Sequence, residues 1–169
     1  MNEITIRKAV VEDERTLLEI RHKSWLSAYT HIFSKKEINK RFEERYNDYA
    51  YREKSKKRIE NAEHFYIAEE NGEPVAMMIL DVCNGAGEAE IECLYCLPTH
   101  QRMGIGGKLF DLAKQIFKAE FKPKFVLTAL KENHIGFAFY KKKGGVVIDE
   151  YADELCGKIV QKVVFEFDL

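Results

Sequence analysis

The chain lacks the features that mark membrane proteins and nucleic-acid-binding proteins. Its 169 residues contain no run of about 18 apolar residues, so no membrane-spanning helix is predicted. Its 27 Lys and Arg side chains are balanced by 28 Asp and Glu, and the net charge of -1 gives no electrostatic preference for a nucleic acid. Residues 1–4 show no basic segment that leads into an apolar one, so no secretory leader is predicted. These absences predict a cytoplasmic protein without a nucleic acid or membrane partner.

Cysteine is scarce and poorly spaced for a metal site or a disulfide. The four cysteines are Cys83, Cys93, Cys96 and Cys156. Cys93 and Cys96 form a C-x-x-C pair, but an odd separation on a strand places two side chains on opposite faces. The five histidines and four cysteines also lack the spacing of zinc ligands. We therefore expect free thiols, buried or half-buried, and no bound metal.

Two familiar phosphate-binding motifs are missing from the most glycine-rich turn, RMGIGG at residues 102–107. A P-loop requires Gly-Lys-Ser/Thr, but Gly107 and Lys108 are followed by Leu109. A Rossmann fingerprint requires its third glycine where Leu109 stands. The turn nevertheless follows an apolar run that ends at Pro98 and leads directly into an amphipathic segment. Its backbone N–H groups then lie at the positive end of a helix, which predicts an anion site of another kind.

Hydrophobic periodicity and turn residues predict a single domain over residues 1–169. The expected strands are residues 4–9, 64–69, 75–82, 89–97, 125–130, 146–148 and 163–169. The expected helices are residues 13–30, a polar helical region at 35–60, one that begins at 105 and is closed by Pro123, and one at 133–143. Asn71-Gly72 predicts a tight hairpin turn. Ser34 and Glu37 form the Ser-x-x-Glu box of a helix start.

The helix that begins at residue 105 has a clear apolar stripe. Ile105, Leu109, Leu112 and Ile116 recur at spacings of four, three and four, which predicts that they face the core.

Two motifs resemble those of the GCN5-related N-acetyltransferases, the GNAT superfamily. Residues 101–106, QRMGIG, match the family pattern Q/R-x-x-G-x-G/A. Residues 133–145 resemble N-x-x-A-x-x-F/Y-Y-x-x-x-G-F, with Gly136 in place of Ala and Gly145 in place of Phe. The resemblance extends from residue 4 to about 168. It implies an α/β (α+β) fold, with a mixed and mostly antiparallel central sheet of about seven strands flanked by about four helices.

The resemblance also implies an activity and a cosubstrate. A GNAT enzyme moves an acetyl group from acetyl-CoA to a primary amine by direct attack, without a metal. A sensor or partner module of the same fold that binds acetyl-CoA without turnover is the alternative. The implied coenzyme ligands lie on the strand end, on the glycine turn and at the start of the last helix. They are Leu94, Tyr95, Cys96, Gln101, Arg102, Met103, Gly104, Ile105, Gly106, Gly107, Asn133 and Tyr140.

Two side chains are candidates for the chemistry itself. Tyr140 occupies the position of the family tyrosine, and a phenol with a pKa near 10 is protonated at neutral pH and can donate to a thiolate. Its other interpretation is a packed aromatic ring. Glu90 aligns with the catalytic glutamate of the histone-acetylating branch and is the expected base, with Glu92 as the reserve. Strand alternation places Glu88 on the same side as both, unless a bulge intervenes, and the alternative is a solvated acidic face.

The acceptor site is expected where the first helices meet the strand ends. Trp25, Tyr29 and Glu92 are its expected lining, although a Trp and a Tyr at helical spacing also suit a core. The neighbouring carboxylates favour a cationic acceptor such as a polyamine, an aminoglycoside, a lysine side chain or a peptide N-terminus. The sequence does not choose among these, and it leaves the oligomeric state, including a homodimer, open.

Overall fold

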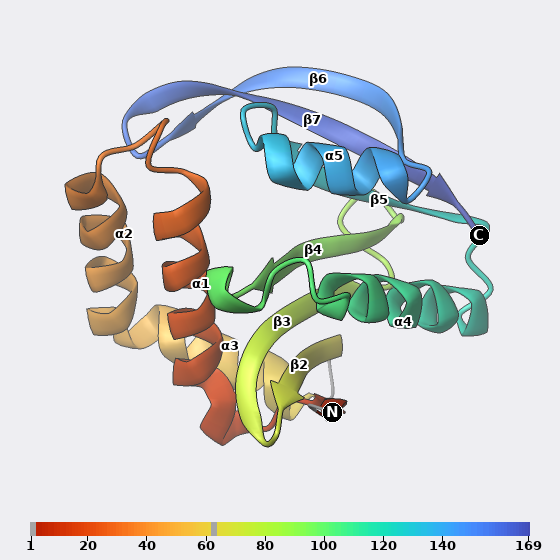
Figure 1. The fold of residues 1–169 in the computed structure, drawn as a ribbon, viewed down its shortest axis with the longest axis horizontal. Coiled ribbons are helices and arrows are strands. Elements are labelled where there is room, and N and C mark those ends of the chain that lie inside the picture. The colour runs from red at the N-terminus through yellow and green to blue at the C-terminus, as the bar shows by residue number, and fades with distance from the viewer. Residues whose placement is uncertain (1–2, 62–63) are drawn as a thin grey trace.

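The computed structural model describes residues 3–61 and 64–169, and its centre is one seven-stranded sheet (Figure 1). The strands are β1 (Ile4–Lys8), β2 (His64–Glu70), β3 (Glu73–Asp81), β4 (Ala89–Cys96), β5 (Lys124–Leu130), β6 (Val146–Leu155) and β7 (Lys158–Asp168). Their order in the sheet is β1-β2-β3-β4-β5-β7-β6. Only β4 and β5 run parallel; the other neighbouring pairs are antiparallel. This architecture confirms the mixed, mostly antiparallel sheet that the sequence predicted.

Five α-helices flank the sheet in the described residues, one more than expected. They are α1 (Glu14–Ala28), α2 (Lys35–Asn47), α3 (Tyr49–Glu60), α4 (Ile105–Ala119) and α5 (His134–Lys142). The polar region expected at 35–60 divides at Asp48, which ends α2 and caps α3 by accepting the Tyr51 N–H at 3.0 Å. The predicted capping box at Ser34 and Glu37 is confirmed at the start of α2.

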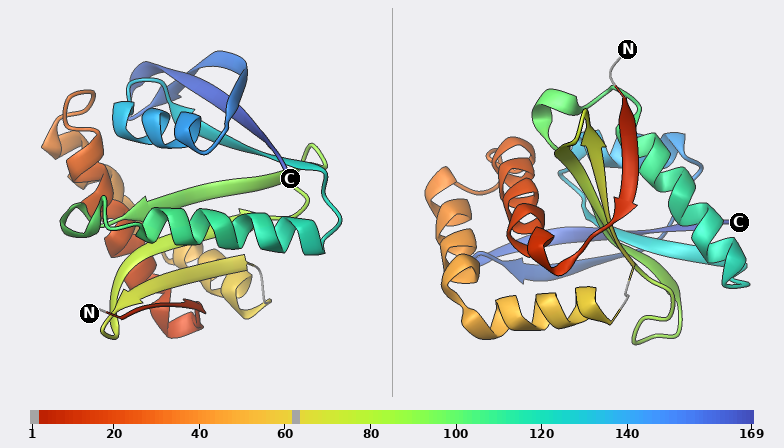
Figure 2. Two further views of the ribbon diagram at one scale, coloured as in Figure 1. Left: turned by 45° about the vertical axis from the view of Figure 1, so that its right-hand side comes forward. Right: turned by 90° about the horizontal axis from the view of Figure 1, so that it is seen from below.

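The helices divide between the two faces of the sheet. α1 and α3 pack on one face of β2, β3 and β4, in a cluster that contains Leu17, Ile59 and Met77. α4 covers the other face, and α5 packs on β5 and β7, as the left view of Figure 2 shows. Cys93 belongs to the first cluster and Cys96 packs against the second, so these two thiols lie on opposite faces, as predicted.

The buried face of α4 differs from the predicted stripe. Its fully buried residues are Ile105, Leu109, Phe110, Ala113 and Phe117. Leu112 and Ile116, which were expected to face the core, are only half-buried. The rings of Phe110 and Phe117 lie 5.6 Å and 5.0 Å from that of Phe125 on β5, and burying these large rings outweighs burying the two aliphatic side chains.

The two last strands are much longer than the sequence indicated. They are joined at Cys156 and Gly157, whose φ angles of 52° and 73° suit a two-residue hairpin. Most of β6 is an exposed edge strand, so it carries no apolar alternation by which its full length could be read. The predicted hairpin at Asn71 and Gly72 is confirmed, with φ angles of 52° and 85°.

The sheet opens between its two parallel strands. β4 and β5 pair only at Ala89 with Phe125 and at Glu90 with Val126, and then diverge toward α1 (Figure 2). On the β5 side, residues 91–96 of β4 therefore have no strand partner. The unpaired end of β4, at residues 91–96, is followed in the chain by the glycine turn at residues 102–107.

Candidate active site

The glycine turn has the geometry of an anion site. Gly104 is the N-cap of α4 with φ 83°, a left-handed conformation that glycine adopts without steric cost. A Cβ at this position would meet no atom within 4 Å, so the requirement is conformational rather than spatial. The first backbone N–H groups of α4 have no acceptor inside the helix and lie at its positive end. The predicted strand, turn and helix are therefore present, and an anion at residues 104–107 remains a prediction.

The end of β4 is held by two side chains at one carbonyl. Ser24 Oγ on α1 and Gln101 Nε2 both donate to the Cys96 carbonyl oxygen, each at 3.3 Å. The Gln101 side chain, expected to bind coenzyme, therefore braces the strand end against the turn. The backbone of Leu94 and Tyr95 lies before this braced point, on the open side of the strand.

A β-bulge changes the expected arrangement of the carboxylates. Ile79 pairs with Cys93 but Leu80 pairs with Ile91, so Glu92 is the additional residue on β4. Ile91 and Cys93 consequently pack in different clusters, although simple alternation would place them on one face. The bulge that the sequence left open is therefore present, and regular alternation does not continue through Glu92.

Both candidate bases have partners inside the protein. Asn84 Nδ2 donates to Glu90 Oε2 at 2.9 Å, and Arg58 Nη2 on α3 donates to Glu92 Oε1 at 2.5 Å. Glu90 also lies at the start of β4, where the strand still pairs with β5. These pairings neutralise Glu92 and fix Glu90, so the acidic face expected from the sequence is partly occupied.

Tyr140 lies on the opposite side of the opening from β4. Its ring is 8% exposed and packs against Phe139 and Phe165. Burial raises the pKa of Tyr140 well above its usual value, and the proximity of Tyr95 and Cys93 on β4 raises it further. The ring is therefore packed, as one interpretation predicted, and it lies near Tyr95 and Cys93 of β4. The role of the phenol as an acid stays a prediction.

Asn133 is the N-cap of α5. Its side-chain oxygen accepts the Gly136 N–H at 3.0 Å, and its Nδ2 donates to the Tyr29 hydroxyl at 3.3 Å. A Cβ on Gly136 would approach Asn133 Nδ2 to 2.6 Å, which explains why glycine replaces the family alanine there. At Gly145 a Cβ would lie 2.8 Å from the Phe167 ring, so the family phenylalanine does not fit either.

Trp25 and Tyr29 belong to the core rather than to an open wall. They are 4% and 6% exposed, and the Trp25 indole N–H donates to the Tyr95 hydroxyl at 3.0 Å. Burial is the main cause that raises the pKa of Tyr29, and the nearby Tyr95 and Tyr140 add to it. Trp25 and Tyr29 therefore touch the proposed site through their polar atoms: Trp25 through Tyr95, and Tyr29 through Asn133.

Two arginines near the site, Arg21 and Arg41, were not predicted from the sequence. Arg21 lies over the Tyr95 ring, and Arg41 over the Trp25 ring, with guanidinium-to-ring distances of 5.8 Å and 5.2 Å. The available signal was the helical spacing of four between Arg21 and Trp25 and between Arg41 and Arg45.

Glu132 is a second overlooked residue. It directly precedes Asn133, and its Oε2 is buried without a hydrogen-bond partner in residues 3–61 and 64–169.

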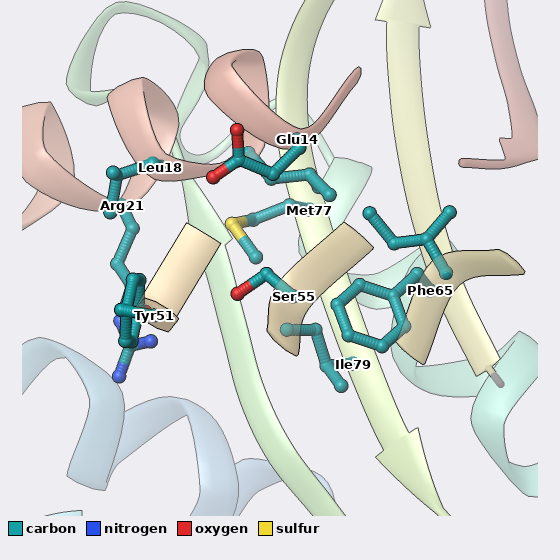
Figure 3. Close-up of a pocket in the computed structure, with 10 residues that line it drawn as sticks. Glu14, Leu18, Arg21, Tyr51, Ser55, Phe65, Met77 and Ile79 are labelled. Atoms are coloured by element: carbon teal, nitrogen blue, oxygen red, sulfur yellow. The ribbon is translucent and has the colours of Figure 1, made fainter. Parts of the chain in front are cut away.

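A small cavity of about 40 Å³ lies beside α1 (Figure 3). Residues from α1, α3, β2 and β3 line it, with Glu14 at one end and Arg21 at the other. The Arg21 side chain runs past Tyr51, and its guanidinium ends on the side away from Glu14 (Figure 3). Glu14 pairs instead with Arg52 at 2.9 Å. The Arg21 charge is therefore directed out of this cavity.

Two other kinds of feature are absent from residues 3–61 and 64–169. No group of three or more His, Cys, Asp or Glu side chains suited to a metal ion occurs in the described part of the chain. Among the same residues, no helix has the length and apolar character needed to cross a membrane.

Comparison with known proteins places the chain in a family. The model of the acetyltransferase (GNAT) family matches residues 25–145. The chain is 29% identical over 147 residues to the spermidine N(1)-acetyltransferase of Thermoplasma acidophilum, covering 86% of this chain and 90% of that protein. The crystal structure of the PaiA N-acetyltransferase of T. acidophilum in complex with coenzyme A superimposes with a TM-score of 0.81 at 27% identity, covering 99% of each chain.

A more distant structure shows the same fold. A GCN5-related N-acetyltransferase from Rhodopseudomonas palustris superimposes with a TM-score of 0.79 at 18% identity, covering 100% of this chain and 98% of that one. Because the family model matches more than half of the sequence, the chain belongs to the GNAT family of acetyltransferases.

Proposed function

We propose that this enzyme transfers an acetyl group from acetyl-CoA to the primary amine of a small molecule by direct attack. The amine nitrogen forms a bond to the thioester carbonyl carbon, the C–S bond breaks, and the thiolate leaves. The attacking amine gives up a proton and the thiolate takes one. The observation that carries the proposal is the juxtaposition of three features: the opening between β4 and β5, the glycine turn that follows it, and the Tyr140 phenol that faces it.

The opening suits the extended arm of the coenzyme. Residues 91–96 of β4 have no strand partner on that side, so the backbone of Leu94 and Tyr95 is available to pair with the pantetheine amides, as an added strand would. The pyrophosphate would then meet the N–H groups at residues 104–107. Coenzyme A in the T. acidophilum PaiA complex supports this assignment.

Tyr140 is the proposed proton donor for the leaving thiolate. Its raised pKa keeps the phenol protonated at neutral pH. A thiol ionises at about 8.5, so the phenol is the weaker acid. We therefore place the proton transfer late, through a hydrogen bond from Tyr140 to the sulfur that strengthens as the C–S bond breaks.

The proton acceptor for the amine is proposed to be Glu90, acting through water. Tyr140 lies near Cys93 and Tyr95, and from Glu90 to these residues β4 rises by roughly 10 to 16 Å. This separation is the reason for placing a water between Glu90 and the amine. The reserve candidate Glu92 is held by Arg58, whereas Glu132 has a free buried oxygen. Comparing Glu90→Gln, Glu92→Gln and Glu132→Gln in a pH–rate profile identifies the base, because its loss removes the acidic limb.

The chemical class of the acceptor amine rests on two observations, the carboxylates of β4 and the name of a relative. A cationic amine was predicted because carboxylates were expected beside the thioester, and the name of the T. acidophilum relative makes spermidine the first acceptor to test. The pairings of Glu90 and Glu92 remove much of that electrostatic argument.

An amine panel tests the proposed activity. The purified chain is incubated with acetyl-CoA and polyamines, diamines, amino acids, aminoglycosides or short peptides. Thiol release and the mass of the acetylated product are followed together, with Tyr140→Phe as the matched control. We expect amine-dependent thiol release that falls in the control. Coenzyme binding without release for any amine would indicate a sensor rather than an enzyme.

A further inference from the structure

Three arginines on α1 and α2 lie close enough for their charges to act on one another, and none forms an ion pair with a carboxylate in residues 3–61 and 64–169. They are Arg21, Arg41 and Arg45, all half-buried. Arg21 Nε, Arg41 Nε and Arg45 Nη1 are buried and have no hydrogen-bond partner in the described chain. The other arginines of the helices and strands behave differently, since Arg7, Arg15, Arg52 and Arg58 each pair with a carboxylate. Among the arginines of the described helices and strands, only these three therefore have no ion pair with a carboxylate.

Aromatic rings hold the guanidinium groups but do not cancel their charge. Arg41 lies 5.2 Å from the Trp25 ring, Arg45 lies 5.2 Å from the Tyr51 ring, and Arg21 lies over Tyr95. Burial lowers the pKa of Arg45 to about 10, and the charges of Arg21 and Arg41 lower it further. Like charges taken partly out of water cost free energy, and a bound anion would offset that cost.

The cluster adjoins the proposed reaction centre on its acceptor side. Arg21 lies over Tyr95, and Tyr95 in turn lies within electrostatic range of Tyr140. The glycine turn that is proposed to hold the coenzyme pyrophosphate belongs to α4, so the arginines of α1 and α2 form a second, separate cationic site. An amine whose other end carries an anion could anchor there and present its nitrogen toward the thioester.

We propose that Arg21, Arg41 and Arg45 bind an oxyanion of the acceptor, so that the enzyme acetylates a primary amine that carries a carboxylate or a phosphoryl group. This inference rests on the proposed function and specifies its acceptor. Planar guanidinium groups with several N–H donors match both kinds of oxyanion. A polyamine would instead bring positive charge to three unneutralised arginines.

Matched pairs of amines test the charge requirement. Each pair shares its amine and differs in the oxyanion: 4-aminobutyrate with butylamine, lysine with cadaverine, and phosphoethanolamine with ethanolamine. The first two pairs test a carboxylate, and the third tests a phosphoryl group. We expect kcat/KM to be at least tenfold higher for the anionic member, either in the two carboxylate pairs or in the phosphoryl pair. Equal or better use of the amines without an oxyanion, or of spermidine, would overturn the proposal.

Variants separate binding by the arginines from a structural role. Arg41→Gln and Arg45→Gln should raise KM for the anionic acceptor at least tenfold, and leave KM for its partner amine and for acetyl-CoA unchanged. Arg15→Gln is the matched control, because Arg15 lies exposed on α1 and pairs with Glu19. Each of these two substitutions removes a charge that repels the other arginines, so neither variant should have a lower midpoint of thermal unfolding. An equal rise in KM for both members of a pair would contradict the assignment.

A binding measurement distinguishes failure of this proposal from failure of the proposed function. Trp25 is the single tryptophan, and Arg41 lies over its ring, so its fluorescence should respond to an anion. We expect saturable titrations with 4-aminobutyrate or phosphoethanolamine that are weakened in Arg45→Gln. Binding without acetylation of any amine would overturn the proposed function and leave the anion site. Acetylation of amines without anion binding would overturn the anion site alone.

Discussion

At the scale of single residues, the side chains around the opening have more partners than their motifs suggest. Asn133 both caps α5 and holds the Tyr29 hydroxyl, and Gln101 braces the Cys96 carbonyl. An asparagine before a helix looks the same in sequence whether it caps or binds a ligand. The motifs therefore predicted which positions meet at the site, but the partner of each side chain depends on neighbours far away in the chain.

Replacing Tyr140 with Phe tests the proton donor. The ring remains to pack on Phe165, so acetyl-CoA binding should barely change. We expect kcat to fall by roughly 10²-fold, the low end for a general acid, because thiolates are fair leaving groups. Steady-state kinetics with acetyl-CoA and with an acetyl thioester of a more acidic thiol measures this. Equal losses with both donors would mean that the hydroxyl positions the coenzyme instead.

The cysteines provide a pH-dependent test of burial. Burial raises the pKa of both Cys93 and Cys96 from 9.0 to about 11, whereas Cys83 is exposed. At pH 8 the thiolate fraction of the two buried thiols is therefore about 100-fold lower than that of an unperturbed thiol. A disulfide reagent should modify Cys83 quickly and Cys93 and Cys96 slowly, as peptide mass mapping would show. Rapid modification of Cys93 at pH 8 would contradict its placement.

The raised pKa values of Cys93 and Cys96 also make the free energy of unfolding depend on pH. Each raised pKa favours the neutral thiol in the folded state, so its contribution to stability is complete below pH 9. It is lost as the pH rises from 9 toward 11, where only the unfolded chain ionises freely.

At the scale of helices and strands, the sequence predicted those elements whose apolar residues or turn residues follow a regular local pattern. The start of α4, the hairpin at Asn71 and Gly72, and the strand before the glycine turn were all predictable. The bulge at Glu92 and the full length of β6 were not, because a bulge leaves no periodic trace and an exposed edge strand needs no apolar face. The buried stripe of α4 was misplaced because the partner ring, Phe125, lies on a different strand.

The start of α4 can be tested by a charge at the glycine turn. Gly104→Glu places a carboxylate against the proposed pyrophosphate position, and should weaken acetyl-CoA binding by at least tenfold, about 1.4 kcal/mol. Gly87→Glu is a matched control. Gly87 has φ 80° against 83° for Gly104, and a Cβ at either position meets nothing within 4 Å, so both variants carry similar backbone strain. Calorimetry that shows equal affinity for the two folded variants would remove the turn from the coenzyme site.

At the scale of the whole molecule, the decisive feature is a sheet that separates in its middle. β4 and β5 hold together at one end and diverge toward α1, and the glycine turn follows the end of β4. The motifs in the sequence predicted the fold, and the binding of coenzyme at this opening stays a prediction. The sequence did not reveal the arginine cluster, because Arg21 and Arg45 come from separate helices that meet only in the folded chain.

Amide hydrogen exchange with and without coenzyme A tests the proposed coenzyme site most directly. We expect slower exchange on binding at the backbone N–H groups of residues 94–96 and 104–107, because β4 gains a pairing partner and the turn gains an anion. Exchange in α2 and α3 should stay unchanged, since the arginine cluster belongs to the acceptor. Protection confined to α1, α2 and α3, with none at the glycine turn, would contradict the central claim that the opening between β4 and β5 is the coenzyme site.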